Sequence, residues 1–202
     1  MGYLAEAGLI LSEVLFGILI GIFAVRVLLQ LVRASFHNPL SQFFYRATNP
    51  LLMPLRKFLA PWGRLDTAGA LVTFLICVVQ VVVQTALFNR PPPLLALIPG
   101  WSPPLLATLL FAAAALINLM LTLYFWLIIA RVIVSFVHPD PRHPMMPILL
   151  QLTEPVFGPL RRTLPTLGPF DLSPLVATLG VVLARVLVVQ PLNDLAVMMS
   201  LT

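Results

Sequence analysis

The chain has 202 residues, of which 60% are hydrophobic and only 9% are charged, and its formal net charge is +5. A soluble domain carries about 25% charged residues, so this composition excludes a soluble globule and predicts an integral membrane protein. The single cysteine, Cys77, excludes a disulfide within the chain and a cysteine-based metal site. In a membrane protein an excess of Lys and Arg is typical of cytoplasmic loops that contact anionic lipid, so we expect no nucleic-acid partner.

Four apolar stretches are each long enough to cross a bilayer, which takes roughly 20 residues. The third stretch is long and is expected to tilt or to project from the membrane. Ser173 and Pro174 are a typical start for the fourth helix, which could extend past Pro191. The stretches predict transmembrane helices over about residues 8–32, 67–88, 105–137 and 173–190.

The basic residues are unevenly distributed among the connections between these stretches. The connection between the second and third stretches contains only Arg90. Because cytoplasmic loops carry the excess of Lys and Arg, we expect the other two connections on the cytoplasmic side and both termini outside. Those connections contain Arg33, Arg46, Arg56, Lys57 and Arg64 in the first case, and Arg142, Arg161 and Arg162 in the second.

One segment of the sequence occurs twice. Residues 39–66 and 144–171 align without a gap at an offset of 105 residues, and nine positions are identical. Each copy contains T-x-P-x(3)-P-L-R-[KR] followed by a G-x-x-D tail. The pattern predicts an all-α membrane protein with four transmembrane helices in two parallel two-helix repeats, related by a pseudo-two-fold axis along the membrane normal. The repeats would span residues 1–89 and 105–202, joined by a proline-rich outer linker at 90–104.

The cytoplasmic elements, residues 34–66 and 138–171, stay apolar but contain prolines every few residues. Because proline interrupts a helix, we expect each element to form two short amphipathic helices in the headgroup layer rather than one long helix. The glycine of the tail would then turn the chain into the next span. The residues expected to shape the elements are Pro50, Pro54 and Gly63 in the first copy, and Pro155, Pro159 and Gly168 in the second.

The charged residues of the two elements allow two interpretations. The basic pairs could anchor the chain to anionic lipid, which we favour, or form one shared site at the pseudo-two-fold axis for a phosphate, a carboxylate or an acidic partner segment. The aspartates could stabilise helix N-termini or pair with the arginine of the same copy. These candidate lipid- or partner-binding residues are Arg56, Lys57, Arg161, Arg162, Asp66 and Asp171.

Several polar residues fall inside the predicted spans. The arginines could reach back to the interface or remain buried and bond carbonyls or a carboxylate. The amides could form hydrogen bonds between helices, which we favour, or line a water or ion pathway with the last arginine. The residues concerned are Arg26, Gln80, Gln84, Asn118, Arg131 and Arg185.

No enzymatic constellation stands out in the sequence. It contains neither a glycine-rich phosphate loop nor a nucleophile elbow, and the three histidines, His37, His138 and His143, lie near the cytoplasmic edge with only Asp140 at a suitable spacing for a metal. We therefore expect no catalytic residue, no cofactor and no metal site.

The doubled proline-arginine element, together with R-x(9)-F-x-N-P-x-S-Q from Arg26 to Gln42, resembles the YggT family of bacterial and plastid integral membrane proteins. The resemblance covers about residues 10–190. It implies a small multi-span protein without an established catalytic activity. It also implies associations of bacterial relatives with osmotic stress or cell division, and of plastid relatives with plastid division, nucleoid distribution and cytochrome assembly.

Together these features predict a non-enzymatic protein of the bacterial inner membrane. Its two cytoplasmic elements would serve as an interaction or assembly platform for anionic lipid, for another membrane protein or for a second copy of the chain. The alternative is an ion or small-solute pathway connected with the osmotic response.

Overall fold

The computed structural model describes residues 3–35, 37–63, 65–88, 104–137, 143, 145–163 and 171–201. These residues are almost entirely helical, apart from one isolated bridge between Trp62 and Leu65. Most of the predicted linker at 90–104 and of the segment at 138–144, together with Gly168, lies outside the described residues. The helices are α1 (Tyr3–Leu31), α2 (Pro39–Leu55), α3 (Thr67–Phe88), α4 (Leu105–Val137), α5 (Met145–Thr163), α6 (Ser173–Ala184), the π-helix η1 (Arg185–Val189) and α7 (Gln190–Leu201).

Four helical segments are long and apolar enough to cross a membrane, which confirms the predicted number of spans. The second and third begin and end close to the predicted residues, but the first and the last are longer than predicted. The segments are Tyr3–Leu31, Thr67–Leu87, Leu105–Ser135 and Ser173–Ser200.

The last span continues through Pro191 because a π-helical turn precedes it. Gln190 donates its backbone N–H to the carbonyl of Arg185, five residues earlier. In a regular α-helix the ring of Pro191 would crowd the carbonyl of Leu187. The wider turn of η1 gives the ring room, so α6, η1 and α7 form one span instead of ending near Gln190.

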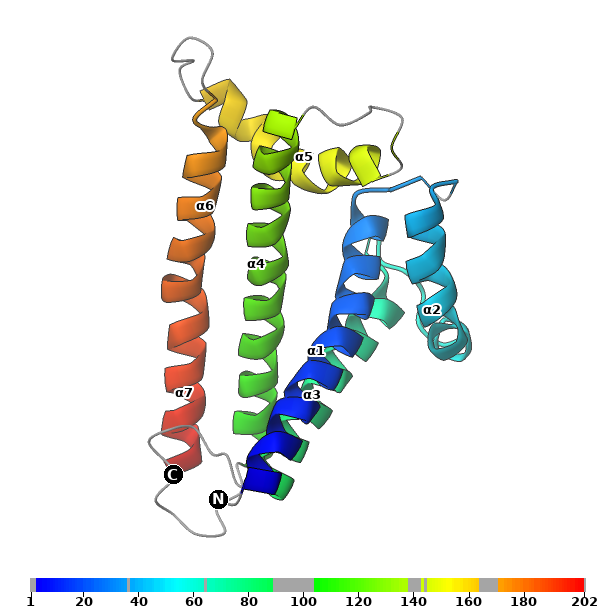
Figure 1. Cartoon of the computed structure of the whole chain (residues 1–202). Helices are drawn as coiled ribbons and strands as arrows, with labels where there is room; N and C mark the ends of the chain where they lie inside the picture. Colours follow the sequence, from blue (N-terminus) through cyan, green and yellow to red (C-terminus); the bar gives the residue numbers. More distant parts are fainter. Residues whose placement is uncertain are drawn as a thin grey trace.

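The spans run alternately up and down, and the two connecting helices lie at the same end (Figure 1). Both termini lie at the opposite end, as the expected topology requires. Helix α1 packs on α3, α3 on α4, and α4 on α6, η1 and α7. A two-fold axis would place α1 onto α4 and α3 onto α6. The contact between α3 and α4 would then have an equal counterpart between α6 and α1, but the described residues make no contact of comparable extent there. The halves therefore do not follow the expected pseudo-two-fold axis.

Each half has its own apolar core beside its connecting helix. In the first half Leu52 of α2 packs with Phe23 of α1 and Val72 of α3. The second half has core residues at the three equivalent positions, 105 residues later in the chain. In the same order they are Phe157, Ile128 and Ala177. The same local packing is thus built twice from different apolar side chains.

The connecting elements differ from the prediction, because each forms one helix and not two. Pro50 and Pro54 lie inside α2, and Pro155 and Pro159 lie inside α5. All four prolines are exposed, on the face opposite to the buried residues Thr48, Leu52, Thr153 and Phe157. The carbonyls that lose a hydrogen-bond donor belong to the exposed residues four positions earlier, where water or headgroups can bond to them, so the helix can continue.

Candidate functional site

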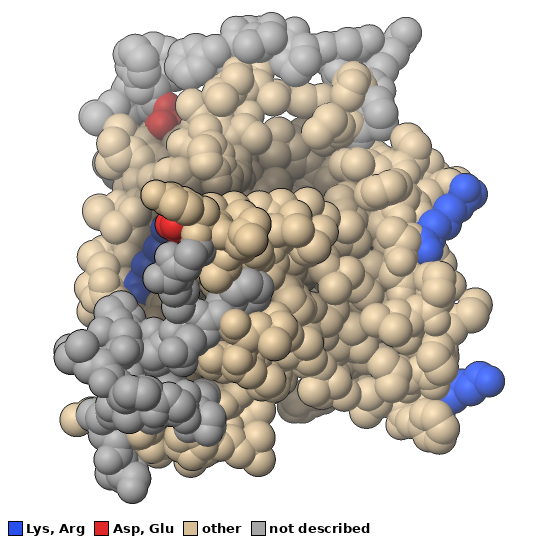
Figure 2. All heavy atoms as spheres, turned by 60° about the horizontal axis from the view of Figure 1, so that its bottom comes forward, with Lys and Arg blue, Asp and Glu red and all other residues tan. Residues whose placement is uncertain are grey.

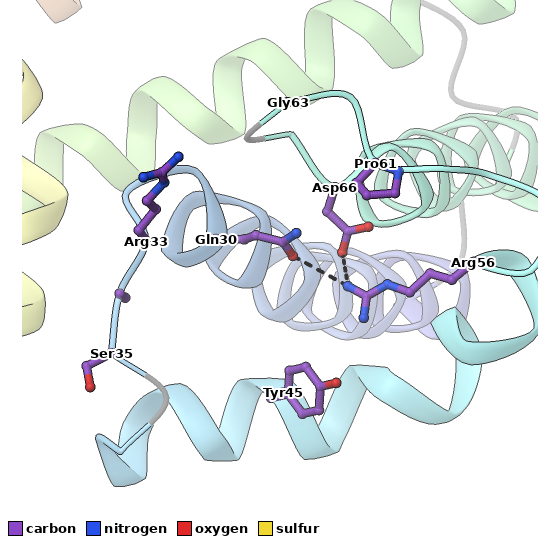
Figure 3. Close-up of a pocket in the computed structure, with 9 residues that line it drawn as sticks. Gln30, Arg33, Ser35, Tyr45, Arg56, Pro61, Gly63 and Asp66 are labelled. Atoms are coloured by element: carbon purple, nitrogen blue, oxygen red, sulfur yellow. Dashed lines mark hydrogen bonds and ion pairs between the residues drawn. The ribbon is translucent and has the colours of Figure 1, made fainter.

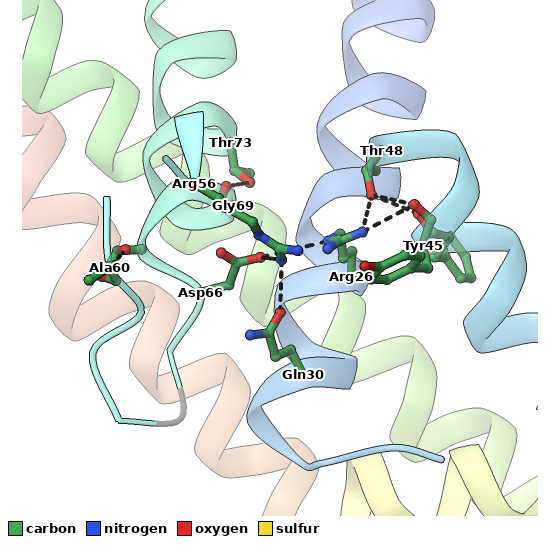
Figure 4. Close-up of polar contacts among 11 residues, drawn as sticks. Arg26, Gln30, Tyr45, Thr48, Arg56, Ala60, Asp66, Gly69 and Thr73 are labelled. Carbon is green, nitrogen blue, oxygen red and sulfur yellow. Dashed lines mark hydrogen bonds and ion pairs between the residues drawn. The ribbon is translucent and has the colours of Figure 1, made fainter. Parts of the chain in front are cut away.

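A buried polar cluster joins α1, α2 and the start of α3 (Figure 4). Arg26 is only 4% exposed; its Nη1 donates to Thr48 Oγ1 at 2.7 Å and to the carbonyl of Tyr45 at 3.2 Å. Its guanidinium lies 4.5 Å from the centre of the Tyr45 ring, and its Nε is 3.7 Å from Asp66 Oδ2. Arg26 is therefore a buried cation that bonds a carbonyl and approaches a carboxylate.

Asp66 connects this cation to the end of α2. Arg56 Nη2 donates to Asp66 Oδ2 and, at 3.4 Å, to Gln30 Oε1. The backbone carbonyl of Asp66 also accepts the N–H of Ala70, so Asp66 stands at the start of α3. Both interpretations of Asp66 are thus combined in one residue, which begins a helix and pairs with the arginine of its own copy.

The close approach of α1 and α3 at this cluster depends on Gly69. A Cβ atom at this position would lie 3.0 Å from Asp66 Oδ2 and 3.2 Å from Val27 Cγ2. Both distances are shorter than ordinary van der Waals contact, so a larger residue would push the carboxylate away from its arginines or α1 away from α3.

The second half repeats two of these contacts at the offset of 105 residues. Arg131 Nη1 donates to Thr153 Oγ1, as Arg26 does to Thr48. Arg161 Nε donates to Asp171 Oδ2 at 2.9 Å, as Arg56 does to Asp66. The carboxylate that meets Arg131 is instead Glu154 on α5, at 3.3 Å. The second cluster is also more open, since the Asp171 side chain is 41% exposed whereas that of Asp66 is 3% exposed.

Asp171 lies outside the spans and is held in its charged form. Burial raises its pKa, but hydrogen bonds from Ser173 and the neighbouring Arg161 guanidinium outweigh this effect, so the pKa stays below its ordinary value. One of these bonds, from the Ser173 backbone N–H to Asp171 Oδ1 at 2.9 Å, places the carboxylate at the start of α6.

The alternative of one shared arginine site is not formed, because the two arginines lie in separate ion pairs. Arg56 and Arg161 each pair with the aspartate of their own half. The residues next to them, Lys57 and Arg162, are exposed, as is Arg46 on α2, and none of these three forms an ion pair within the described part of the chain. In each basic pair, Arg56–Lys57 and Arg161–Arg162, the first residue therefore forms an internal ion pair and the second is exposed on the surface.

The intramembrane amides do not gather around the last arginine. Arg185, in η1, donates from Nη2 to Thr122 Oγ1 on α4 at 2.6 Å. Gln80 and Gln84 lie half-buried on α3, on the other side of α4 in the packing order, and Asn118 is exposed. Within the described residues no hydrogen bond joins these amides to Arg185, so they do not form one polar lining.

A cavity of about 600 Å³ opens beside the first cluster (Figure 3). It lies between the end of α1, helix α2 and the loop before α3. Gly63, at φ +61°, forms the turn of this loop, where Trp62 and Leu65 exchange backbone hydrogen bonds. Gln30, Ser35 and Tyr45 were missed as candidate residues, and Arg33 was only counted among the loop cations. The lining residues are Gln30, Arg33, Ala34, Ser35, Tyr45, Arg56, Pro61, Gly63 and Asp66.

The opposite face of the molecule carries few charges. With the terminal end turned forward, most of the visible atoms are neither basic nor acidic, and basic side chains project at one edge (Figure 2). Within the described residues there is also no group of three or more His, Cys, Asp or Glu that could hold a metal ion.

Comparisons with known proteins identify the family of this chain. The family model CCB3/YggT matches residues 6–87 and again 110–192. An uncharacterised protein of Pseudomonas aeruginosa is 34% identical over 195 residues, which cover 96% of this chain and 93% of that protein. An uncharacterised protein of Vibrio alginolyticus is 35% identical over 88% of this chain and 90% of its own length.

A further relative, the uncharacterised protein YggT of Escherichia coli strain K12, is 29% identical over 77% of this chain and 74% of its own length. No solved structure matches. Because the family model covers most of the sequence in two matches, the chain belongs to the CCB3/YggT family.

Proposed function

We propose that this protein is a non-enzymatic component of the bacterial inner membrane that binds anionic lipid on a platform formed by α2 and α5. One observation carries the proposal: both helices lie at the same end of the bundle, and each ends beside a cation that is free of the internal ion pairs. These cations are Lys57 after α2 and Arg162 in the last turn of α5.

The position of the platform supports this function. The two helices connect the ends of transmembrane spans, so we expect their exposed cations at headgroup depth. Each Lys or Arg near an anionic surface contributes about 1 kcal/mol of attraction. The excess of Lys and Arg on this side agrees with a cytoplasmic platform and with termini outside. A platform that gathers anionic lipid, and with it a membrane partner, would suit a role in osmotic stress or cell division.

The geometry favours this platform over an ion or solute pathway. The pathway hypothesis requires Gln80, Gln84, Asn118 and Arg185 to face one another. Instead, α4 separates the glutamines from Arg185, which bonds Thr122.

The proposal can be tested by lipid selection in nanodiscs. The protein is reconstituted with equal amounts of phosphatidylglycerol and phosphatidylcholine, and native mass spectrometry counts the lipids that stay bound. The wild-type chain should retain phosphatidylglycerol preferentially, and combining Arg46→Gln, Lys57→Gln and Arg162→Gln should remove most of this preference. Arg90→Gln, which removes a cation from the other side, is the control and should change nothing. A triple variant with the wild-type lipid preference contradicts the proposal.

A further inference from the structure

We infer that the cavity at the α2 end of the first half binds a single phosphate group, either in a lipid headgroup or as free phosphate. The inference rests on the lipid-platform function proposed above and adds one defined site to it. The volume, about 600 Å³, falls within the range of roughly 300–1,000 Å³ that is typical of small-molecule sites.

The charge of the lining favours an anion. Arg33 and Arg56 face the cavity, and Arg26 lies directly behind Asp66. Arg33, Arg56 and Arg26 thus place three positive charges at or behind the cavity against the single carboxylate of Asp66, which leaves two positive charges in excess. Asp66 itself is only 3% exposed and is covered by its arginines, whereas Arg56 is 29% exposed and can be reached from the cavity. A bound phosphate would neutralise the excess, and guanidinium groups match its oxygens in bidentate geometry.

The other polar groups of the lining can supply donors. The carbonyl oxygen of Gln30 accepts from Arg56, which leaves the amide nitrogen of Gln30 to donate into the cavity. Figure 3 shows Gln30 between Arg33 and Arg56, with Asp66 beside Arg56. The hydroxyl oxygen of Ser35 accepts the N–H of His37 at 3.3 Å, so its own hydrogen can turn toward a ligand.

The backbone at Arg33 is strained in a way that orients this side chain. Arg33 has φ 54°, and the hydrogen bonds from Arg33 N–H to the Gln30 carbonyl (3.0 Å) and from Ala34 N–H to the Leu29 carbonyl (2.8 Å) close the end of α1. Glycine usually occupies this left-handed position because any Cβ atom is unfavourable there. Residues kept in such conformations are concentrated at functional sites, which supports a role for the Arg33 side chain at this cavity.

Two features distinguish this cavity from the second half of the chain: its position at the end of the first span, and lining residues that the second copy does not fully repeat. Arg33 lies two residues after Leu31, the last residue of the first span, so we expect it at headgroup level. At the offset of 105 residues, Gln30, Arg33 and Tyr45 correspond to Ser135, His138 and Leu150. The second copy keeps the counterparts of Arg56, Gly63 and Asp66 but lacks those of Gln30, Arg33 and Tyr45, so we expect one phosphate per chain.

The site can be tested with the full-length protein in a mild non-ionic detergent. Isothermal titration calorimetry with inorganic phosphate and, separately, with soluble dihexanoyl phosphatidylglycerol should show saturable binding at one equivalent per chain. Arg33→Gln should weaken binding on the order of tenfold, as expected for a lost charged hydrogen bond. Arg33 is exposed, so this variant should fold normally. Arg90→Gln, which removes a cation from the connection between α3 and α4 and belongs to neither the platform nor the cavity lining, is the control and should bind like the wild-type chain.

The two probes identify the source of the phosphate. Tighter binding of the short-chain lipid supports a headgroup ligand, whereas equal or tighter binding of inorganic phosphate supports a free-phosphate site. The inference is overturned if neither probe binds saturably, or if Arg33→Gln binds as tightly as the wild-type chain. If the nanodisc experiment still shows retention of phosphatidylglycerol that depends on Lys57 and Arg162, only the cavity is rejected and the platform stands.

Discussion

Arg26 on α1 and Asp66 at the start of α3 approach to 3.7 Å between Nε and Oδ2, with side chains only 4% and 3% exposed. Arg56 reaches the same carboxylate oxygen from the end of α2. One buried carboxylate thus holds together the two spans and the interfacial helix of the first half. Its loss would leave two arginines without a counter-charge, one of them in a buried site.

Asp66→Asn should therefore destabilise the protein by about 3–5 kcal/mol, because removing one partner of a buried ion pair leaves an uncompensated charge. The equivalent change in the second half, Asp171→Asn, should cost at most about 1 kcal/mol, because that pair is largely exposed. Thermal unfolding of both variants in the same detergent measures the difference. Equal losses of stability would show that the two clusters are energetically equivalent and that burial does not distinguish them.

Gly69→Ala should cost about 1–3 kcal/mol, because the added methyl group would meet Asp66 and Val27 at 3.0–3.2 Å. Gly180→Ala in α6 is the matched control, because its Cβ would have no neighbour within 4 Å. There we expect a gain of about 0.5–1 kcal/mol from better helix propensity. Chemical unfolding followed by circular dichroism compares the two, and a neutral Gly69→Ala would contradict the close approach of α1 and α3.

Arg33→Gly should stabilise the protein by about 1 kcal/mol, since glycine adopts φ 54° without the penalty that a side chain causes. The same change should weaken the phosphate binding proposed above on the order of tenfold, as Arg33→Gln does. Arg33→Ala separates the two effects, because it removes the guanidinium but keeps the backbone penalty. If Arg33→Gly lowered stability instead, the arginine side chain would be contributing to the fold itself.

The ion pair of Asp171 should depend on pH in the acid range. Its folded-state pKa is below the ordinary value of 3.8, so its contribution is present above about pH 4 and is lost as the pH falls through the lowered value. The difference in unfolding free energy between the wild-type chain and Asp171→Asn should therefore shrink below pH 4. Unfolding midpoints at a series of pH values test this, and a difference that grows on acidification would contradict the direction of the pKa shift.

Composition and pattern alone were sufficient for the four spans, for the doubled element and for its placement at one end of the bundle. These properties depend on local hydropathy and on repeated letters, which require no knowledge of packing. Proline statistics were misleading for α2 and α5, because whether a proline ends a helix depends on where its freed carbonyl points. In both helices each freed carbonyl belongs to an exposed residue.

The ion-pair partners were decided only by the tertiary structure. From the sequence, Asp66 had two possible roles, and Arg26 could be either an interfacial or a buried cation; the packing of α1, α2 and α3 brings them together. The cavity at Arg33 also depends on the path of the loop around Gly63 and on the left-handed end of α1. Such features arise where segments far apart in the chain meet, and there the energy of a charge depends on burial and distance rather than on its neighbours in sequence.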